Sequence, residues 1–245
     1  MSGPVRLDVF SDYLCPWCYN AAVRVAEVER EYGDRVEIHW RAFPLIPDQQ
    51  PGRRVTQKMR EGRARVAAEE PRALFVTPEL DTALPASSVP AQTAAKCAQR
   101  QGADAFTRFR DGLFVTAFRD NLDISRRDVL WTLARQCGLD VARFEADYAS
   151  GEAYEAVLHD CAEGAAWFGV SALPTVIFDE KLSLVGAVPT ERYRWMIDWI
   201  LAGQPGNVIN LTEMGGPSGS PHTPPDARSA VHQAGRSAVT LERKD

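Results

Sequence analysis

The sequence predicts an α/β fold with a long helical segment inserted between the second and third strands. Apolar and polar residues alternate at 5–10 and at 36–43, and helical spacing fills the stretch between them. Two further short apolar segments, 173–178 and 182–186, are separated by a polar turn and predict a hairpin. The long stretch between the second and third strand segments shows helical periodicity, which places the insertion there.

The first strand–helix–strand unit forms the start of the predicted core, which we assign to residues 4–53. Its helix ends near Gly33, and its second strand stops before a proline. Two strands joined by a helix at this spacing predict a right-handed parallel βαβ unit. The hairpin and a last helix, which opens at Pro189, complete the core over residues 170–202.

Residues 54–169 are predicted to form the inserted helical domain. Polar residues suited to helix N-caps are Ser88, Ser125 and Asp140. The aromatic side chains of 106–118 share one helix face, and core packing is their expected role. Glycine and proline separate candidate helices at 53–70, 90–100, 106–118, 125–135, 140–148 and 152–168.

The last segment, 203–245, is rich in Gly, Pro, Ser and Thr, with few apolar residues. This composition predicts a flexible tail, because little apolar surface is available to offset the entropy of ordering. The alternative is an extended arm that packs on a second copy of the chain, which would make the protein a homodimer.

Composition points to an ordinary soluble protein. A net charge of −5 argues against a nucleic-acid surface, and no apolar run is long enough to cross a membrane. No basic region followed by an apolar stretch opens the sequence, so no secretory signal is expected. The five cysteines are an odd number and do not suggest a disulfide scaffold. We therefore expect the protein to work in the cytoplasm.

The strongest functional signal is Cys15-Pro16-Trp17-Cys18, placed where the first strand runs into the first helix. The helix dipole and the unpaired N–H groups of the first turn favour a thiolate at Cys15. Proline fits the first turn because its missing N–H would have no partner there. This arrangement is typical of a reactive dithiol rather than a structural pair.

The alternatives for this motif are a zinc half-site or two unrelated core cysteines. Structural zinc usually needs four ligands, and neither a second C-x-x-C nor a nearby histidine pair supplies the rest. His39 stands alone on a strand, while Cys97, Cys137 and Cys161 are scattered singly and are expected to be buried apolar residues. We therefore predict redox chemistry, with no metal and no other cofactor.

Two segments resemble the DsbA-like branch of the thioredoxin superfamily and, within it, the cytoplasmic FrnE-like group. They are residues 10–18, Phe-Ser-Asp-Tyr-Leu-Cys-Pro-Trp-Cys, and 169–175, Gly-Val-Ser-Ala-Leu-Pro-Thr. The resemblance covers about residues 4 to 202 and leaves out the tail. It implies a thioredoxin-like fold with a helical insertion, and a cis peptide before Pro174. It also implies that Cys15 is the nucleophile and Cys18 the resolving thiol.

The resemblance implies further site residues. The loop at Leu173 and Pro174 would face the cysteines and receive an extended substrate segment by strand-like pairing. Pro16 and Trp17 would contact substrate, although Trp17 is equally suited to ordinary packing. In the family, a buried acid moves protons at the resolving thiol. Aligning this sequence with the family pattern, with one extra residue before Cys15, puts Asp8 near the position of that acid. The alternative for Asp8 is the solvent-facing side of its strand.

The leading functional hypothesis is a thiol–disulfide oxidoreductase that oxidises, reduces or isomerises disulfides of protein or small-molecule substrates. A second is an isomerase or transferase using a glutathione-type thiol, related to 2-hydroxychromene-2-carboxylate isomerase. Those relatives usually carry serine where this chain has Cys15. A third is a holdase chaperone without catalysis. None of the three requires a nucleic acid or a membrane as partner, and the physiological substrate and direction of electron flow stay open.

Overall fold

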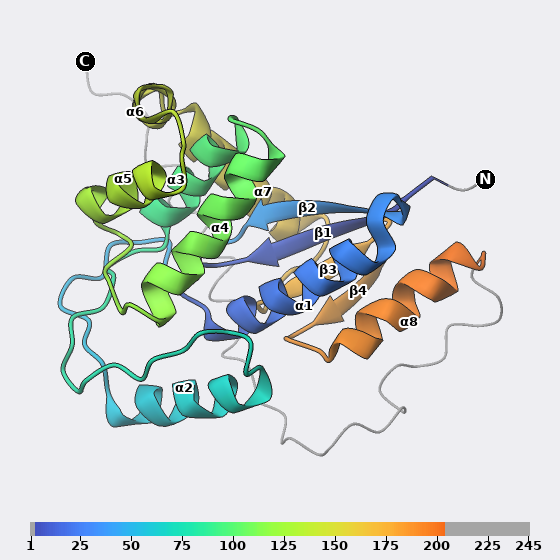
Figure 1. The fold of residues 1–245 in the computed structure, drawn as a ribbon, viewed down its shortest axis with the longest axis horizontal. Coiled ribbons are helices and arrows are strands. Elements are labelled where there is room, and N and C mark those ends of the chain that lie inside the picture. The colour runs from blue at the N-terminus through green and yellow to red at the C-terminus, as the bar shows by residue number, and fades with distance from the viewer. Residues whose placement is uncertain (1–2, 204–245) are drawn as a thin grey trace. The chain divides into compact units, whose positions relative to one another are not determined.

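A computed structural model describes residues 3–203 of the chain (Figure 1). The predicted tail, 203–245, therefore lies outside the described residues except for its first one. Up to Leu201 the chain forms one compact unit. Within the described range, no helix combines the length and the apolar character needed to cross a membrane.

A four-stranded sheet forms the centre of this unit. Its order is β2-β1-β3-β4, and its strands are β1 (Val5–Ser11), β2 (Val36–Ala42), β3 (Thr175–Phe178) and β4 (Leu182–Val185). β1 pairs in parallel with β2, while β3 pairs antiparallel with both β1 and β4. The predicted parallel unit, the hairpin and the insertion between the second and third strands are all confirmed.

Helices cover both faces of the sheet (Figure 1). On one face lie α1 (Pro16–Tyr32) and α8 (Thr190–Leu201), which pack against each other. On the other face α7 (Glu152–Ala166) packs against β2. A single turn of 3-10 helix, Gly33–Arg35, links α1 to β2. The cysteine-bearing helix and α7 are therefore separated by the sheet.

The insertion supplies the remaining helices, which are α2 (Gln57–Glu69), α3 (Val89–Gln99), α4 (Ala103–Phe118), α5 (Arg127–Gln136) and α6 (Val141–Ala149). Of the predicted caps, Asp140 is confirmed, because its carboxylate accepts from the Arg143 N–H at 3.0 Å. Ser88 precedes α3 but its hydroxyl accepts from the Ile46 N–H instead. Ser125 is not a cap, since α5 begins after Arg126 and the Ser125 hydroxyl bonds to Asp123.

The aromatic face of α4 is part of the core, as predicted. Phe114 stacks on Tyr19 of α1 with ring centroids 5.1 Å apart and planes within 4°. The ring of Tyr13, just before the cysteines, lies 5.0 Å from that of Phe114. Phe118 also packs against both rings, 5.9 Å from Tyr19 and 6.5 Å from Phe114. These contacts fix the first turn of α1 against the insertion. α2 is different, because Val66 is the one buried residue among its 13.

A glycine allows α7 to approach the sheet closely. A β-carbon at Gly164 would lie 2.7 Å from Cε1 of Phe10 and 3.1 Å from Phe43, which is closer than side chains tolerate. Phe10 is completely buried and forms a core cluster with Val170 and Ile177. The α7 face of the sheet is therefore packed around a residue without a side chain.

Gly164→Ala should destabilise the protein by about 1–3 kcal/mol, because the added methyl group overpacks a filled core. Urea unfolding measures the change. Gly62→Ala is the matched control: Gly62 lies inside α2, where an added methyl group would meet no neighbour within 4 Å, and alanine favours a helix over glycine by up to about 1 kcal/mol. A Gly164 variant as stable as the Gly62 variant would contradict the packing described.

Candidate active site

The end of β1 places Cys15 at the start of α1. The strand stops at Ser11, and a turn closed by the Cys15 N–H to the Asp12 carbonyl, at 3.2 Å, leads to the helix. Cys15 occupies the N-cap position in an extended conformation, and Pro16 opens the helix. The Cys15 carbonyl accepts from the Cys18 N–H at 3.0 Å. Both cysteines of the motif thus belong to the first turn, as predicted.

The two thiols differ in their surroundings. Cys15 is 6% exposed and Cys18 is 0% exposed, and both are free. Burial raises the pKa of Cys18 well above its usual value, and the hydrogen bond to the Cys15 sulfur raises it further. Contacts from the Asp12 backbone and the Ser11 side chain oppose this rise but are smaller in effect. Cys18 therefore holds its proton more firmly than an exposed thiol does.

Asp12 is a buried acid at this turn that the sequence motifs did not single out. Its carboxylate accepts from the Leu14 N–H at 2.5 Å and from the Leu45 N–H at 2.7 Å, so it joins the turn to the loop after β2. Burial raises the pKa of Asp12, and hydrogen bonds from Ser88 and the two backbone groups counter part of the rise. A sequence signal existed, because an aspartate that bonds the N–H two residues on forms a common turn.

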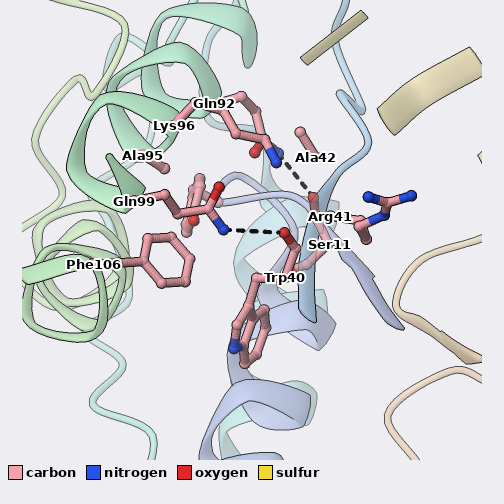
Figure 2. A pocket seen from close by; sticks show the side chains of 10 residues that line it. Ser11, Trp40, Arg41, Ala42, Gln92, Ala95, Lys96, Gln99 and Phe106 are labelled. Atoms are coloured by element: carbon pink, nitrogen blue, oxygen red, sulfur yellow. Dashed lines mark hydrogen bonds between the residues drawn. The ribbon is translucent and has the colours of Figure 1, made fainter. Parts of the chain in front are cut away.

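A small cavity lies between the end of β1, β2 and α3 (Figure 2). Its volume is about 10 Å³, which is near the lower limit for a single water molecule. The Gln92 amide donates to the Ser11 carbonyl at 2.8 Å, and the Gln99 amide to the Trp40 carbonyl at 3.3 Å. These bonds satisfy the backbone carbonyls of Ser11 and Trp40 and join α3 to the ends of both strands.

The Leu173–Pro174 peptide is cis, as the family resemblance implied. Strand pairing sets Thr175 opposite Phe10, so Pro174 stands beside the end of β1, from which the turn leads to Cys15. The Pro174 carbonyl accepts from the Gly186 N–H at 2.8 Å. Leu173 is half-buried and packs against the core cluster that contains Phe10. Pro16 and Trp17, which lie between the two cysteines in the chain, are also half-buried.

Residues 6–197 match the family described as DSBA-like thioredoxin domain. The chain belongs to this family. Among curated proteins, this DSBA-like chain is similar to the ClpXP adapter protein SpxH of Halalkalibacterium halodurans. The two are 25% identical over 217 residues, which span 82% of this chain and 69% of the relative. The SpxH protein of Bacillus licheniformis is 26% identical over 208 residues.

Solved structures show the same fold. A probable DsbA oxidoreductase from Streptomyces coelicolor is 25% identical, with a TM-score of 0.68 over 90% of this chain and 100% of that one. The cytosolic disulfide reductase DsbM from Pseudomonas aeruginosa, solved with GSH, is 21% identical, with a TM-score of 0.58 over 81% and 98%. The thioredoxin-like fold and the DsbA-like resemblance are confirmed, while the FrnE-like branch stays a prediction.

Asp8 lies away from the cysteines of this DSBA-like domain. Its buried carboxylate pairs with Arg6 at 2.8 Å and with Arg41 at 3.5 Å. Arg41 pairs in turn with Asp160 of α7 at 3.2 Å, so this ion-pair cluster lies on the α7 side of the sheet. The cysteine-bearing helix covers the other side (Figure 1). Asp8 is therefore neither beside Cys18 nor facing solvent, whereas the backbone of Asp12 contacts the Cys18 sulfur.

One group of possible metal ligands occurs among the residues that the structure describes, His159, Asp160 and Glu163. Asp160 already pairs with Arg41 and Lys96, and it accepts from the Ala42 N–H at 2.8 Å. Glu163 also pairs with Arg41. Because these cations satisfy the carboxylates, the group is an ion-pair network between α7, α3 and β2.

Iodoacetamide at neutral pH should label Cys15 before Cys18, because Cys18 is fully buried and its pKa is raised. Peptide mass spectrometry of the reduced protein gives the order. Cys97 is the internal control: it is 0% exposed, burial raises its pKa to about 12, and it should stay unlabelled. Preferential labelling of Cys18 would contradict the assignment of nucleophile and resolving thiol.

Asp12→Asn should change how stability depends on pH. Burial raises the folded-state pKa of Asp12 above the ordinary value of 3.8, so its contribution is complete below that value. The contribution is lost as pH rises through the raised folded-state pKa. As the pH rises through the folded-state pKa of Asp12, the wild type should therefore lose stability relative to Asp12→Asn. Urea unfolding of both proteins at each pH measures this difference.

Asp48→Asn is the matched control for Asp12, because Asp48 is exposed in the loop after β2. Its stability difference from the wild type should stay nearly constant over the same pH range. A constant difference for the Asp12 variant as well would show that its carboxyl group titrates as an exposed one does.

Proposed function

We propose that the protein catalyses thiol–disulfide exchange through Cys15 and Cys18. The observation that carries this proposal is the position of Cys15 at the N-cap of α1, with the buried Cys18 thiol as its neighbour one turn on. A helix N-terminus stabilises negative charge through its dipole and its free N–H groups. The pair thus combines a more accessible attacking sulfur with a protected resolving one.

The exchange proceeds in two steps. The Cys15 thiolate attacks one sulfur of a substrate disulfide, forming a mixed disulfide and breaking the substrate S–S bond. The leaving substrate thiolate takes up a proton. Cys18 then loses its proton and attacks the Cys15 sulfur, so that the Cys15–Cys18 disulfide forms and the second substrate thiolate leaves. Two electrons pass from the protein to the substrate, and the reverse sequence oxidises a substrate dithiol.

Asp12 and Ser11 are the groups that we assign to the second step. The Asp12 backbone and the Ser11 side chain both favour the ionised form of Cys18 by lowering its pKa. Without such help the resolving step would be slow, because burial holds the proton on Cys18.

The cis-proline loop is the proposed substrate-binding edge. Leu173 would pair its backbone with an extended substrate segment, while Pro16 and Trp17 would contact the residues around the substrate disulfide. The position of Pro16 and Trp17 directly after Cys15 and the partial exposure of all three side chains support this role. We expect disulfide- or thiol-containing proteins and small molecules as substrates.

A second candidate function is binding of a partner protein without turnover. It is favoured by the similarity to the SpxH proteins, which are described as ClpXP adapters. Such a function would survive replacement of both Cys15 and Cys18 by serine, whereas disulfide exchange would not. The double variant therefore separates the two functions.

We also place the proposed activity in the cytoplasm. Cys97, Cys137 and Cys161 are free thiols in the structure, and a reducing compartment keeps such thiols free. Fractionation of cells that express the full chain tests the location.

Cys15→Ser should abolish reduction of a disulfide-bonded peptide, because no sulfur remains to attack. Cys18→Ser should accumulate a mixed disulfide between Cys15 and the peptide, since nothing resolves it. Non-reducing gels and intact-mass measurement detect this species. The control is Cys161→Ser, which changes a half-buried thiol on α7 and should leave turnover unchanged. Turnover by the Cys15 variant would disprove the mechanism.

A further inference from the structure

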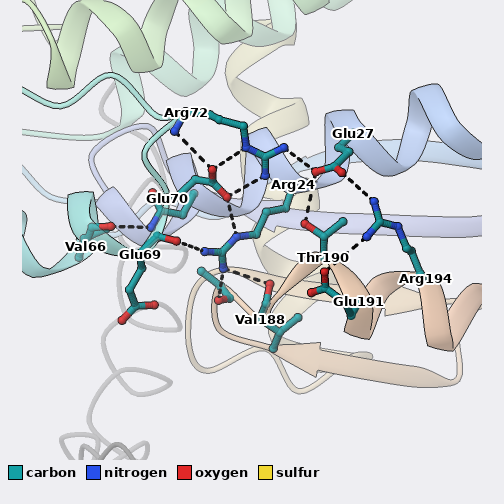
Figure 3. A network of polar contacts seen from close by, with 12 residues as sticks. Arg24, Glu27, Val66, Glu69, Glu70, Arg72, Val188, Thr190, Glu191 and Arg194 are labelled. Atoms are coloured by element: carbon teal, nitrogen blue, oxygen red, sulfur yellow. Dashed lines mark hydrogen bonds and ion pairs between the residues drawn. The ribbon is translucent and has the colours of Figure 1, made fainter. Parts of the chain in front are cut away.

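Arg24 is a buried cation on α1 that the proposed chemistry does not use. Its side chain is 7% exposed, and its Nε donates to Glu70 Oε2 at 3.0 Å. Nη1 donates to the carbonyls of Ala187, at 2.6 Å, and Val188, at 3.1 Å, and Nη2 donates to the Glu69 carbonyl at 2.8 Å (Figure 3). The guanidinium thus joins α1 to the end of α2 and to the segment after β4.

The segment after β4 is the one that contacts the cis-proline. Gly186, next to Ala187, donates its N–H to the Pro174 carbonyl at 2.8 Å, and the Gly186 carbonyl accepts from the Val188 N–H at 2.9 Å. Arg24 therefore holds the two residues that follow the glycine bonded to Pro174. α1 carries the cysteines at its start. About two turns further on it carries Arg24, which donates to the segment that is hydrogen-bonded to the cis-proline loop.

The charge of Arg24 is balanced by a chain of ion pairs. Glu70 accepts from Arg72 through both oxygens, at 2.7 and 2.9 Å, as well as from Arg24. Arg72 also pairs with Glu27 of α1 at 2.5 Å (Figure 3). These contacts lower the pKa of Glu70 to about 2, with the hydrogen bond from Arg72 as the largest cause. Glu70 is therefore a permanent partner for Arg24 at neutral pH.

An apolar residue would fill this position at less cost in desolvation, so a buried ion pair is weak grounds for a purely stabilising role. What distinguishes Arg24 is its bonding to three backbone carbonyls in two separate segments. A guanidinium offers five N–H groups in a rigid fork, which fixes directions as well as distances. The contacts serve to hold backbone segments at a set position relative to α1.

We propose that Arg24 is a positioning residue that fixes the cis-proline loop relative to the Cys15–Cys18 turn. Through Ala187 and Val188 it sets the place of Gly186, and through the Gly186 N–H it sets the Pro174 carbonyl. The loop is thereby held ready for an extended substrate before substrate arrives. The effect on turnover rests on the proposed function, whereas the effect on the loop does not.

The first test is hydrogen–deuterium exchange of the full-length chain carrying Arg24→Met, which keeps the length of the side chain without its donors. The Gly186 and Val188 N–H groups should exchange faster, while those of β1 keep their protection. The matched control is Arg30→Met, because Arg30 is an exposed residue of the same helix. Unchanged exchange at Gly186 and Val188 would overturn the proposal, whether or not the protein has redox activity.

The second test compares two reactions of the same variants. Alkylation of Cys15 by iodoacetamide needs no loop and should keep its wild-type rate in Arg24→Met. The kcat/KM for a disulfide-bonded peptide should fall about 10- to 100-fold, since a displacement near 1 Å can cost that much. Equal losses in both reactions would show a general structural defect and overturn the positioning role.

Arg24→Lys keeps the experiment decisive if the methionine variant does not fold. Lysine retains the charge opposite Glu70, but its single ammonium group lacks the fork that reaches several carbonyls. A folded lysine variant should show faster exchange at Gly186 and a smaller loss of kcat/KM. Wild-type values of both quantities would overturn the proposal. A wild type without peptide turnover would contradict the proposed function alone.

Discussion

The hydrogen bonds of the Asp12 carboxylate determine how the candidate site is built. They cap the Leu14 N–H, within the turn that leads to Cys15, and the Leu45 N–H, at the start of the loop after β2. A buried N–H without a partner costs about 1–3 kcal/mol, so bonds of this kind let the turn end β1 abruptly. The turn then delivers Cys15 to the N-cap position of α1.

Charge is arranged differently on the two faces of the sheet. On the α7 face, Arg41 joins Asp8 of β1 to Asp160 and Glu163, and Lys96 of α3 completes the cluster. On the α1 face, Arg24 pairs with Glu70 and donates to backbone carbonyls. The first cluster joins secondary-structure elements mainly through ion pairs between side chains. The second holds loops, and it is the one that lies on the same helix as the cysteines.

Much of the fold could be predicted because its signals are local. Alternation of apolar and polar residues indicated the strands. Asp140 could be predicted as an N-cap because its carboxylate accepts from Arg143, three residues further along the chain. Ser88 and Ser125 failed as caps because the loop before α3 and Asp123 offered their hydroxyls other partners, which no local pattern reveals.

The candidate site shows the same limit. The cysteines and the cis-proline were recognisable from their motifs, but the surroundings of Asp8 were not. Only the tertiary structure shows that the buried Asp8 carboxylate joins the ion pairs of Arg41 on the α7 face of the sheet. Arg24 was equally hidden, because its carbonyl partners lie 45 or more residues away in the chain.

The sparse packing of α2 has a consequence for how the molecule opens. With Val66 as its single buried residue, the helix is attached to α1 largely through polar bonds, from Asn20 to the Val66 carbonyl and from Arg24 to that of Glu69. Elements with few buried apolar contacts detach at a free energy well below that of global unfolding. A protease would therefore reach α2 while the sheet is still folded, and each such opening would release the backbone next to Glu70 from its contact with the cysteine helix.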